Sequence, residues 1–325
     1  MSYKNKLSLP CLAGHTNDIM ATSDLPTSPP GMMLIRAGCA LAYQATQPLA
    51  LLLLVKPHVA PSQILVRDML ETSSSQALEE FTDAHGNTLV RTTLLPGTTR
   101  FRHDALILVP ESPHELPAGV ERVPIARLPP DALRYTFASR YCESDKLAQF
   151  ANQHFGHIDD AAEQVRAVCD WTHTHIAYRY GSGTPFLSAC DVIARGYGVC
   201  RDYAHVMIAL CRALDIPARY VAGHMPYLGV SEADIGIDFH AYCEVFLGDR
   251  WHVFDPRHRR VHRGRVKIAH GMDAVDAAFG TMYGAAQLVD FQVWAYEITD
   301  PNEAIGGPVS IMRGADGSAV RTLAA

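Results

Sequence analysis

The chain has 325 residues, which is long enough for two domains or for one large domain with additions. Its 28 Lys and Arg against 34 Asp and Glu give a mildly acidic protein, so no net positive charge attracts nucleic acid or an anionic membrane. Eight cysteines over this length show neither the density nor the paired spacing of a disulfide framework, which favours reduced thiols in a cytoplasmic setting.

The first 31 residues are polar and rich in Pro, Ser and Thr, and they end at Pro29-Pro30-Gly31. This composition predicts a disordered extension over residues 1–31. The N-terminus has no apolar signal core, and the longest apolar stretch, 49–55, is too short to cross a bilayer. The sequence therefore predicts a protein that is not exported and does not enter a membrane.

Short apolar runs separated by turn residues fill the segment from 32 to 110. The runs are Met33–Arg36, Leu51–Val55, Leu89–Arg91 and Ala105–Val109. Runs of this length between turn signals predict strands, and their spacing predicts a small β-sandwich-like domain. Nothing in this segment resembles a reactive site.

Proline marks the next boundary. Six prolines fall between residues 110 and 135, which predicts an inter-domain linker over 111–135. We expect the second domain to span 136–298, with a helix beginning after Asp159-Asp160. The Gly- and Ala-containing stretch 299–325 is expected to be a flexible tail.

A cysteine follows two glycines in the stretch Arg195–His205. Cys200 opens an apolar-periodic run that stops at Pro217, which predicts a helix with the cysteine at its N-terminus. Unpaired N–H groups and the positive end of the helix dipole favour the thiolate, the nucleophilic form of cysteine. Asp202 falls in the first turn, where a carboxylate stabilises a helix.

A reactive cysteine needs an imidazole, and position decides among 16 histidines. His205 lies about 140° around the same helix from Cys200, which turns it away. A hairpin with a two-residue loop at Gly248-Asp249 would instead place His240 diagonal to Asp255, with Cβ atoms roughly 7–8 Å apart or less. An imidazole and a carboxylate can bridge that distance.

Three separated motifs occur in the order Cys, His, Asp. They are Gly198-Val199-Cys200-Arg201-Asp202, the run Leu210–Val221, and Phe239-His240-Ala241-Tyr242 with Trp251 and Asp255-Pro256. Together they resemble the transglutaminase-like superfamily over residues 165–256. The resemblance implies an α+β fold with a papain-like core, in which the cysteine helix packs on an antiparallel sheet, preceded by the β-sandwich-like domain. It also implies Cys200 as nucleophile, His240 as general base and acid, and Asp255 as the residue that orients the imidazole.

The activity that follows is acyl transfer, with hydrolysis of an amide or peptide bond of a protein or peptide substrate through a thioester. Water is the expected acceptor, because the sequence shows no site for a second amine. Two alternatives stay open: glutamine γ-glutamyl transfer, as Gln–Lys crosslinking or deamidation, and a non-catalytic binding module on the same scaffold. We expect no cofactor. The calcium dependence of animal transglutaminases has no matching acidic loop here.

Other reactive residue types have simpler interpretations. Cys169, Cys211 and Cys243 lie in apolar surroundings and are expected to pack in the core. The basic run that begins at Arg257 is expected to be a solvated face, not a nucleic-acid site, because no aromatics interleave with it. No C-x-x-C or H-E-x-x-H spacing indicates zinc. The loop from about 224 to 238 leads into His240, so we expect it to border the site.

Overall fold

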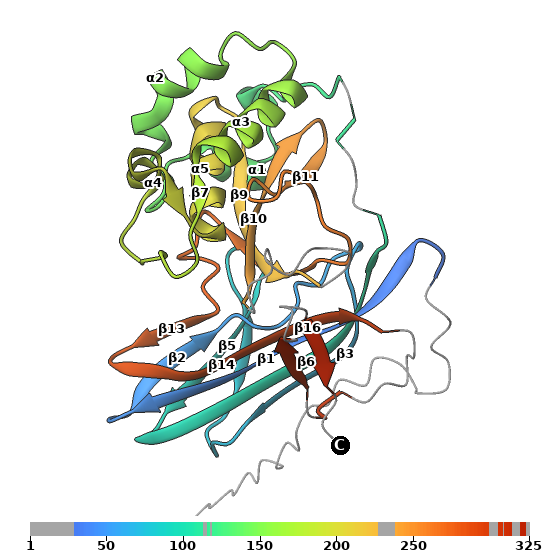
Figure 1. Ribbon diagram of the computed structural model, residues 1–325, viewed down its shortest axis with the longest axis vertical. Coiled ribbons are helices and arrows are strands. Elements are labelled where there is room, and N and C mark those ends of the chain that lie inside the picture. Colours follow the sequence, from blue (N-terminus) through green and yellow to red (C-terminus); the bar gives the residue numbers. More distant parts are fainter. Residues whose placement is uncertain are drawn as a thin grey trace, which may run out of the picture.

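The computed structural model describes residues 29–112, 116–117, 119–226, 238–298, 305–307, 309–313 and 319–322. The first 28 residues of the predicted extension lie outside the described residues. Figure 1 shows a lower part made of sheets and an upper part in which helices pack on a further sheet. The predicted α+β class, with a β-rich part before the cysteine helix, is confirmed.

The lower part is a sandwich of two antiparallel four-stranded sheets, with strand orders β14-β1-β6-β3 and β13-β2-β5-β4. The facing side chains of the two sheets, such as Leu41, Leu51 and Leu94, are buried in one apolar cluster. Its strands are β1 Met32–Ala45, β2 Leu49–Leu53, β3 Ile64–Thr72, β4 Glu79–Thr82, β5 Thr88–Leu94, β6 Gly97–Pro110, β13 Gly280–Tyr283 and β14 Ala286–Glu297.

Two strands of this sandwich come from the far end of the chain. β14 pairs antiparallel with β1, for example Gly38 with Trp294, and β13 pairs with β2. In Figure 1 their orange and red arrows lie beside the blue ones. The expected division into 32–110 and 136–298 therefore does not match the strand pairing, because the sandwich takes its last two strands from within 136–298.

The proline-rich segment also differs from the expected linker. It contains the short helices η1 Ile125–Arg127, α1 Pro130–Leu133 and η2 Arg134–Thr136. Pro130 is the first residue of α1, where proline is tolerated because that position needs no hydrogen bond from its nitrogen. Ala132 and Tyr135 are buried, so this part of the segment packs against the upper domain.

The upper part is a helical layer on an antiparallel sheet of order β11-β10-β9-β12. Helix α5 lies between that sheet and the other helices (Figure 1), and its residues from Val206 to Leu210 are fully buried. The elements are α2 Ser144–Phe155, α3 Ala161–His175, β7 Ala177–Tyr178, α4 Ala189–Arg195, β8 Tyr197–Gly198, α5 Cys200–Ala213, β9 Ala218–His224, β10 His240–Leu247, β11 Arg250–Phe254 and β12 Val266–Gly271.

The two helices that the sequence predicts begin where they are expected. Asp160 caps α3 by accepting a hydrogen bond from the Glu163 N–H at 2.8 Å. Helix α5 begins at Cys200, and Asp215, just after its end, adopts a left-handed φ of 59° before Pro217. The predicted cysteine helix is therefore confirmed.

Two side-chain amides of the lower part form hydrogen bonds with the backbone of β12, as a neighbouring strand would. Asn87 donates to the His270 carbonyl at 2.8 Å and accepts from its N–H at 2.9 Å. Gln63 makes the same pair of bonds with Lys267, both at 2.7 Å. Both amides are buried, so these bonds fix the sandwich against the free edge of the upper sheet.

The segment after β14 is partly held in place, unlike the flexible tail expected over 299–325. The Gly306 N–H donates to Asp104 at 2.8 Å, and Arg102 donates to the Gly307 carbonyl. Strands β15 Ser310–Arg313 and β16 Ala319–Thr322 form a hairpin. The other residues of that segment lie outside the described ones.

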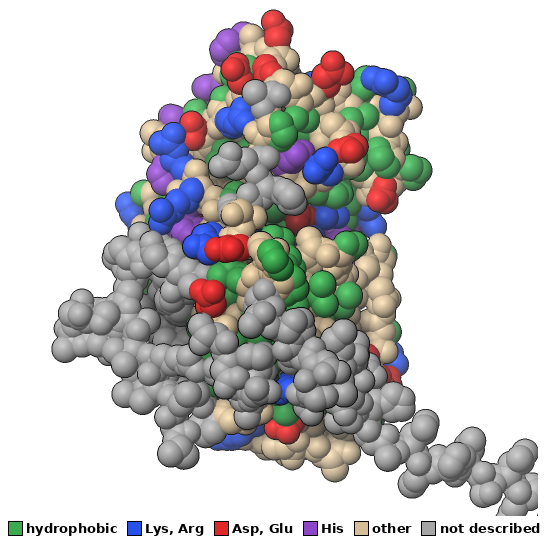
Figure 2. All heavy atoms as spheres, turned by 90° about the vertical axis from the view of Figure 1, so that its right-hand side faces the viewer, with side chains coloured by type: hydrophobic (Ala, Val, Ile, Leu, Met, Phe, Trp, Pro, Cys, Tyr) green, Lys and Arg blue, Asp and Glu red, His purple; other side chains and the backbone are tan. Residues whose placement is uncertain are grey.

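Basic and acidic side chains are interspersed over the upper part of the surface in Figure 2, without a field of one sign. In the described ranges, no helix combines the length and the apolar character needed to cross a bilayer.

Candidate active site

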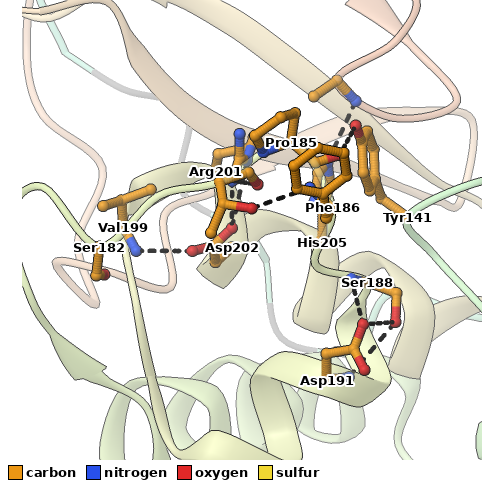
Figure 3. Close-up of polar contacts among 12 residues, drawn as sticks. Tyr141, Ser182, Pro185, Phe186, Ser188, Asp191, Val199, Arg201, Asp202 and His205 are labelled. Atoms are coloured by element: carbon orange, nitrogen blue, oxygen red, sulfur yellow. Dashed lines mark hydrogen bonds and ion pairs between the residues drawn. The ribbon is translucent and has the colours of Figure 1, made fainter.

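Cys200 is the first residue of α5, and buried charge fixes the turn that leads into it. Asp202 is fully buried and accepts a hydrogen bond from the Val199 N–H at 3.0 Å (Figure 3). The same carboxylate pairs with Arg195 at 2.9 Å and with Arg201 at 3.0 Å. Asp202 therefore does more than stabilise the helix dipole, because it ties the residue before Cys200 to two arginines.

Gly196 and Gly198, the two glycines of this turn, are required for different structural reasons. Gly196 ends α4 with a left-handed φ of 71°, which favours glycine. Gly198 passes so close to Asp202 that a Cβ there would lie 2.6 Å from the Asp202 Cβ. A larger residue at position 198 would therefore displace the carboxylate that holds the turn.

His240 and Asp255 meet as the hairpin register predicts. β10 pairs with β11 so that Leu247 faces Arg250 and Cys243 faces Phe254, which is the register of a two-residue loop. His240 is the first residue of β10, and Asp255 directly follows β11. The His240 Nε2 lies 2.7 Å from the Asp255 Oδ2, so the carboxylate fixes the ring and leaves Nδ1 for another partner.

The charge states of this pair are set by opposing effects. Burial disfavours the charged imidazole, but the Asp255 carboxylate and a hydrogen bond with Cys200 outweigh it and raise the pKa of His240 to about 9. Burial likewise opposes the Asp255 carboxylate, and His240 outweighs it, so the pKa of Asp255 lies well below its usual value. Near neutral pH the two groups form a buried imidazolium–carboxylate pair.

Cys200 and His240 both line one cavity of about 640 Å³. Much of the remaining wall is apolar and comes from both parts of the molecule: Leu54, Tyr220, Met225, Phe239, Ile268, Ala277 and Phe279. Met225 and Asp238, which belong to the loop expected to border the site, also line the cavity, whereas residues 227–237 of that loop lie outside the described ones. The cavity thus offers an apolar surface beside a thiol and an imidazole.

The comparisons with known proteins address the same part of the chain. The model of the transglutaminase-like superfamily matches residues 148–256, which run from α2 to the proline after Asp255. A crystal structure of a provisionally assigned cysteine protease from Cytophaga hutchinsonii is 32% identical, with a TM-score of 0.74 over 84% of this chain and 93% of that one. The chain belongs to the transglutaminase-like superfamily.

Curated relatives are more distant. An uncharacterized protein of Mycobacterium leprae is 27% identical over 116 residues, and one of Mycobacterium tuberculosis is 29% identical over 143 residues. These matches cover 35% and 41% of this chain, and 42% and 45% of the relatives. The chain therefore spans less than half the length of the curated relatives it matches.

His205 does not line the cavity that Cys200 and His240 line. It is fully buried, stacks on Tyr141 at 4.9 Å between ring centroids, and accepts the Ala274 N–H at 3.2 Å (Figure 3). The prediction from its helical position is confirmed. Of the aromatic residues near the site in sequence, Tyr178 and Tyr180 line the cavity, whereas Trp171 stacks on His175 elsewhere.

His258 is a site residue that the sequence did not reveal. Its Nδ1 lies 3.4 Å from the Asp255 Oδ2, and its backbone N–H donates to Oδ1 at 3.3 Å. Burial lowers the pKa of His258 to about 4, so the ring is neutral at pH 7. His240, Asp255 and His258 have ligand atoms within 4.8 Å of one another, as a metal site would, but the contacts here are those of a hydrogen-bonded carboxylate. The spacing Asp255-x-x-His258 was the available signal.

The basic run divides into separate contacts. The Arg257 guanidinium lies 3.7 Å from the Tyr178 ring centroid at the cavity. Arg259 pairs with Asp170 at 2.8 Å, and Arg263 pairs with Glu111 at 2.7 Å. These members of the run therefore point to three different neighbours.

Proposed function

We propose that this chain is a cysteine-dependent acyl-transfer enzyme that hydrolyses amide or peptide bonds, with Cys200 as nucleophile, His240 as general base and acid, and Asp255 as the orienting carboxylate. One observation carries the proposal. A cysteine at a helix N-terminus and a buried His240–Asp255 pair, 2.7 Å apart, meet at the same cavity.

The geometry supports a two-step reaction. With Nε2 held by Asp255, the Nδ1 of the His240 imidazolium keeps the proton that the Cys200 thiol has given up, and the Cys200 thiolate attacks the substrate carbonyl carbon. The Cys200 N–H has no partner within α5, because it belongs to the first residue of that helix, and it can donate to the developing oxyanion. The imidazolium then protonates the leaving amine, and a thioester remains on Cys200.

The second step decides between hydrolysis and transamidation. In hydrolysis His240 takes a proton from water, the hydroxyl attacks the thioester carbon, and the sulfur leaves with the proton. We favour water as the acceptor, in a reducing cytoplasmic compartment that suits the seven free described cysteines. Gln–Lys crosslinking remains the alternative, and incorporation of a labelled amine into a glutamine substrate separates the two.

The apolar wall of the cavity favours substrates with an apolar side chain near the scissile carbonyl. Val275 lines the cavity and is 53% exposed, so a charge there does not have to be buried in the core. We expect Val275→Glu to lower kcat/KM for peptide substrates that carry leucine or phenylalanine next to the scissile carbonyl. The expected decrease is about tenfold, which corresponds to ~1.4 kcal/mol. Val289→Glu is the matched control, because Val289 is 50% exposed and lies in β14, outside the cavity lining. Equal effects of both variants would contradict the proposed preference.

Alkylation by iodoacetamide tests the activated thiol. Burial raises the pKa of Cys142 and Cys211 to about 12, and that of the half-buried Cys190 to about 11. We therefore expect Cys200 to be labelled at least tenfold faster than these cysteines at pH 7. His240→Ala should remove most of this advantage, because it removes the imidazolium beside the sulfur.

Mass spectrometry locates the labelled residue, which also separates Cys200 from Cys11, outside the described residues. Labelling that is slow at all positions, or unchanged in His240→Ala, would support the non-catalytic binding module instead.

A further inference from the structure

A second cavity, of about 300 Å³, lies on the other face of the upper sheet from α5. Tyr242 and Glu244 line it, whereas Cys243, between them on β10, contacts Met207 of α5. The sandwich closes the cavity from its side through His58 and Gln63. The cavity is thus at the junction of the two parts and separate from the one that Cys200 lines.

Positive charge exceeds negative charge among the described residues around this cavity. Arg219 and Lys267 both pair with Glu244, at 2.6 Å and 2.8 Å. Arg265 is a third cation in the lining, and Glu244 is the sole carboxylate of that lining. Burial lowers the pKa of His58 and His262 to about 4, so these rings are neutral at pH 7. The described lining therefore carries two positive charges in excess.

Arg265 differs from the other two cations, because two of its nitrogens find no hydrogen-bond acceptor among the described residues. Its Nε and Nη1 are buried without a hydrogen-bond partner, although the guanidinium lies 4.8 Å from the Tyr242 ring centroid. His262, which is 7% exposed and lines the same cavity, has a buried Nε2 without a partner as well. A guanidinium with buried nitrogens that lack acceptors costs free energy, so Arg265 suits an anion that would accept hydrogen bonds from it.

We propose that this cavity binds a small phosphomonoester, with its phosphoryl group held by Arg265, Lys267 and Arg219. A phosphomonoester carries a charge of about −1.5 to −2 at pH 7, which balances the excess of two. Its three acceptor oxygens match the fork of guanidinium donors better than a single carboxylate does. A cavity of about 300 Å³ limits the ligand to a small molecule.

Calorimetric titration of the full chain with inorganic phosphate, at pH 7 and constant ionic strength, tests the site. We expect saturable binding with one phosphate per chain, and at least tenfold weaker binding in Arg265→Gln. Arg263→Gln is the matched control, because this substitution removes the same charge two residues away. Arg263 pairs with Glu111 on the surface and does not line the cavity. Its affinity should stay within twofold of the wild type.

A second measurement is made on the wild-type protein, with one conservative variant as its control. Trp251 lines the cavity, so phosphate should change the tryptophan fluorescence of the wild type, and Trp251→Phe should lose this change. Acetate at the same ionic strength should have little effect. Equal weakening in Arg265→Gln and Arg263→Gln, titration without saturation, or acetate binding as tight as phosphate would each overturn the proposal. None of these readouts depends on the reaction at Cys200.

Discussion

Amide hydrolysis should fall by about 10⁴-fold or more when Cys200 is replaced by alanine, because no other described group of the cavity can form the thioester. Asp255→Asn should cost on the order of 10²–10⁴-fold in kcat. An amide at position 255 can donate where the carboxylate accepts, which favours the wrong imidazole tautomer and removes the charge that raises the pKa of His240. Steady-state kinetics with a peptide amide substrate measures both effects.

Two controls make the result specific. Cys190→Ala removes a half-buried thiol outside the cavity lining and should leave kcat unchanged. The double variant Cys200→Ala/His240→Ala should be no slower than Cys200→Ala alone, because residues that act as one unit do not add. Substantial hydrolysis by Cys200→Ala would refute the proposed nucleophile, whereas inactivity of all forms toward amides would direct attention to other acyl substrates.

Acid should destabilise this protein steeply below pH 6.5. Six histidines have pKa values lowered mainly by burial: His58, His205, His224, His258, His262 and His270. In the unfolded chain they take up protons near pH 6.5. In the folded protein burial lowers the pKa of His58, His258 and His262 to about 4, that of His224 to about 3 and that of His270 to about 2, and it holds the pKa of His205 well below its usual value. The unfolded state therefore binds more protons in this window, so the contribution of these six histidines to stability is full above pH 6.5 and is lost as the pH falls toward 4.

The slope is about 1.4 kcal/mol per pH unit for each extra proton bound by the unfolded state, so several histidines together can exceed the stability of a typical domain. Urea unfolding followed by circular dichroism at pH 7, 6 and 5 measures it. His224→Leu should reduce the slope by about one proton, because burial lowers the pKa of His224 to about 3. His157→Gln, at an exposed position, should leave it unchanged. A flat profile between pH 7 and 5 would contradict the expectation.

Local chemistry made much of the site predictable. The pairing of His240 with Asp255 follows from a two-residue turn and the period of a strand, so it needs only residues that are close in sequence. The same holds for Cys200 at the start of α5, where glycines precede an apolar helix that ends at Ala213, before Pro217. The family resemblance added the order of the three motifs.

The rest depended on contacts between distant segments. No local pattern in the sequence predicts that β14 pairs with β1, because the residues 286–297 would predict a strand whichever strand they paired with. Glu244, at 8% exposed, shows the same limit, since its partners Arg219 and Lys267 lie more than 20 residues away on either side. His258 was hidden for another reason: it stands among arginines, and a basic run suggests a solvated face.

The return of β13 and β14 also determines the order in which a ribosome can complete this molecule. About 170 residues separate the end of β6 from β13, which corresponds to roughly ten seconds or more of synthesis. During that interval β1 and β2 are the open edges of their sheets, and such edges invite pairing with other chains. The sandwich, whose first strands are made first, is thus completed last. A nascent chain stopped before residue 280 should need a chaperone for these open sheet edges, while the upper part that contains Cys200 has already been made and can fold.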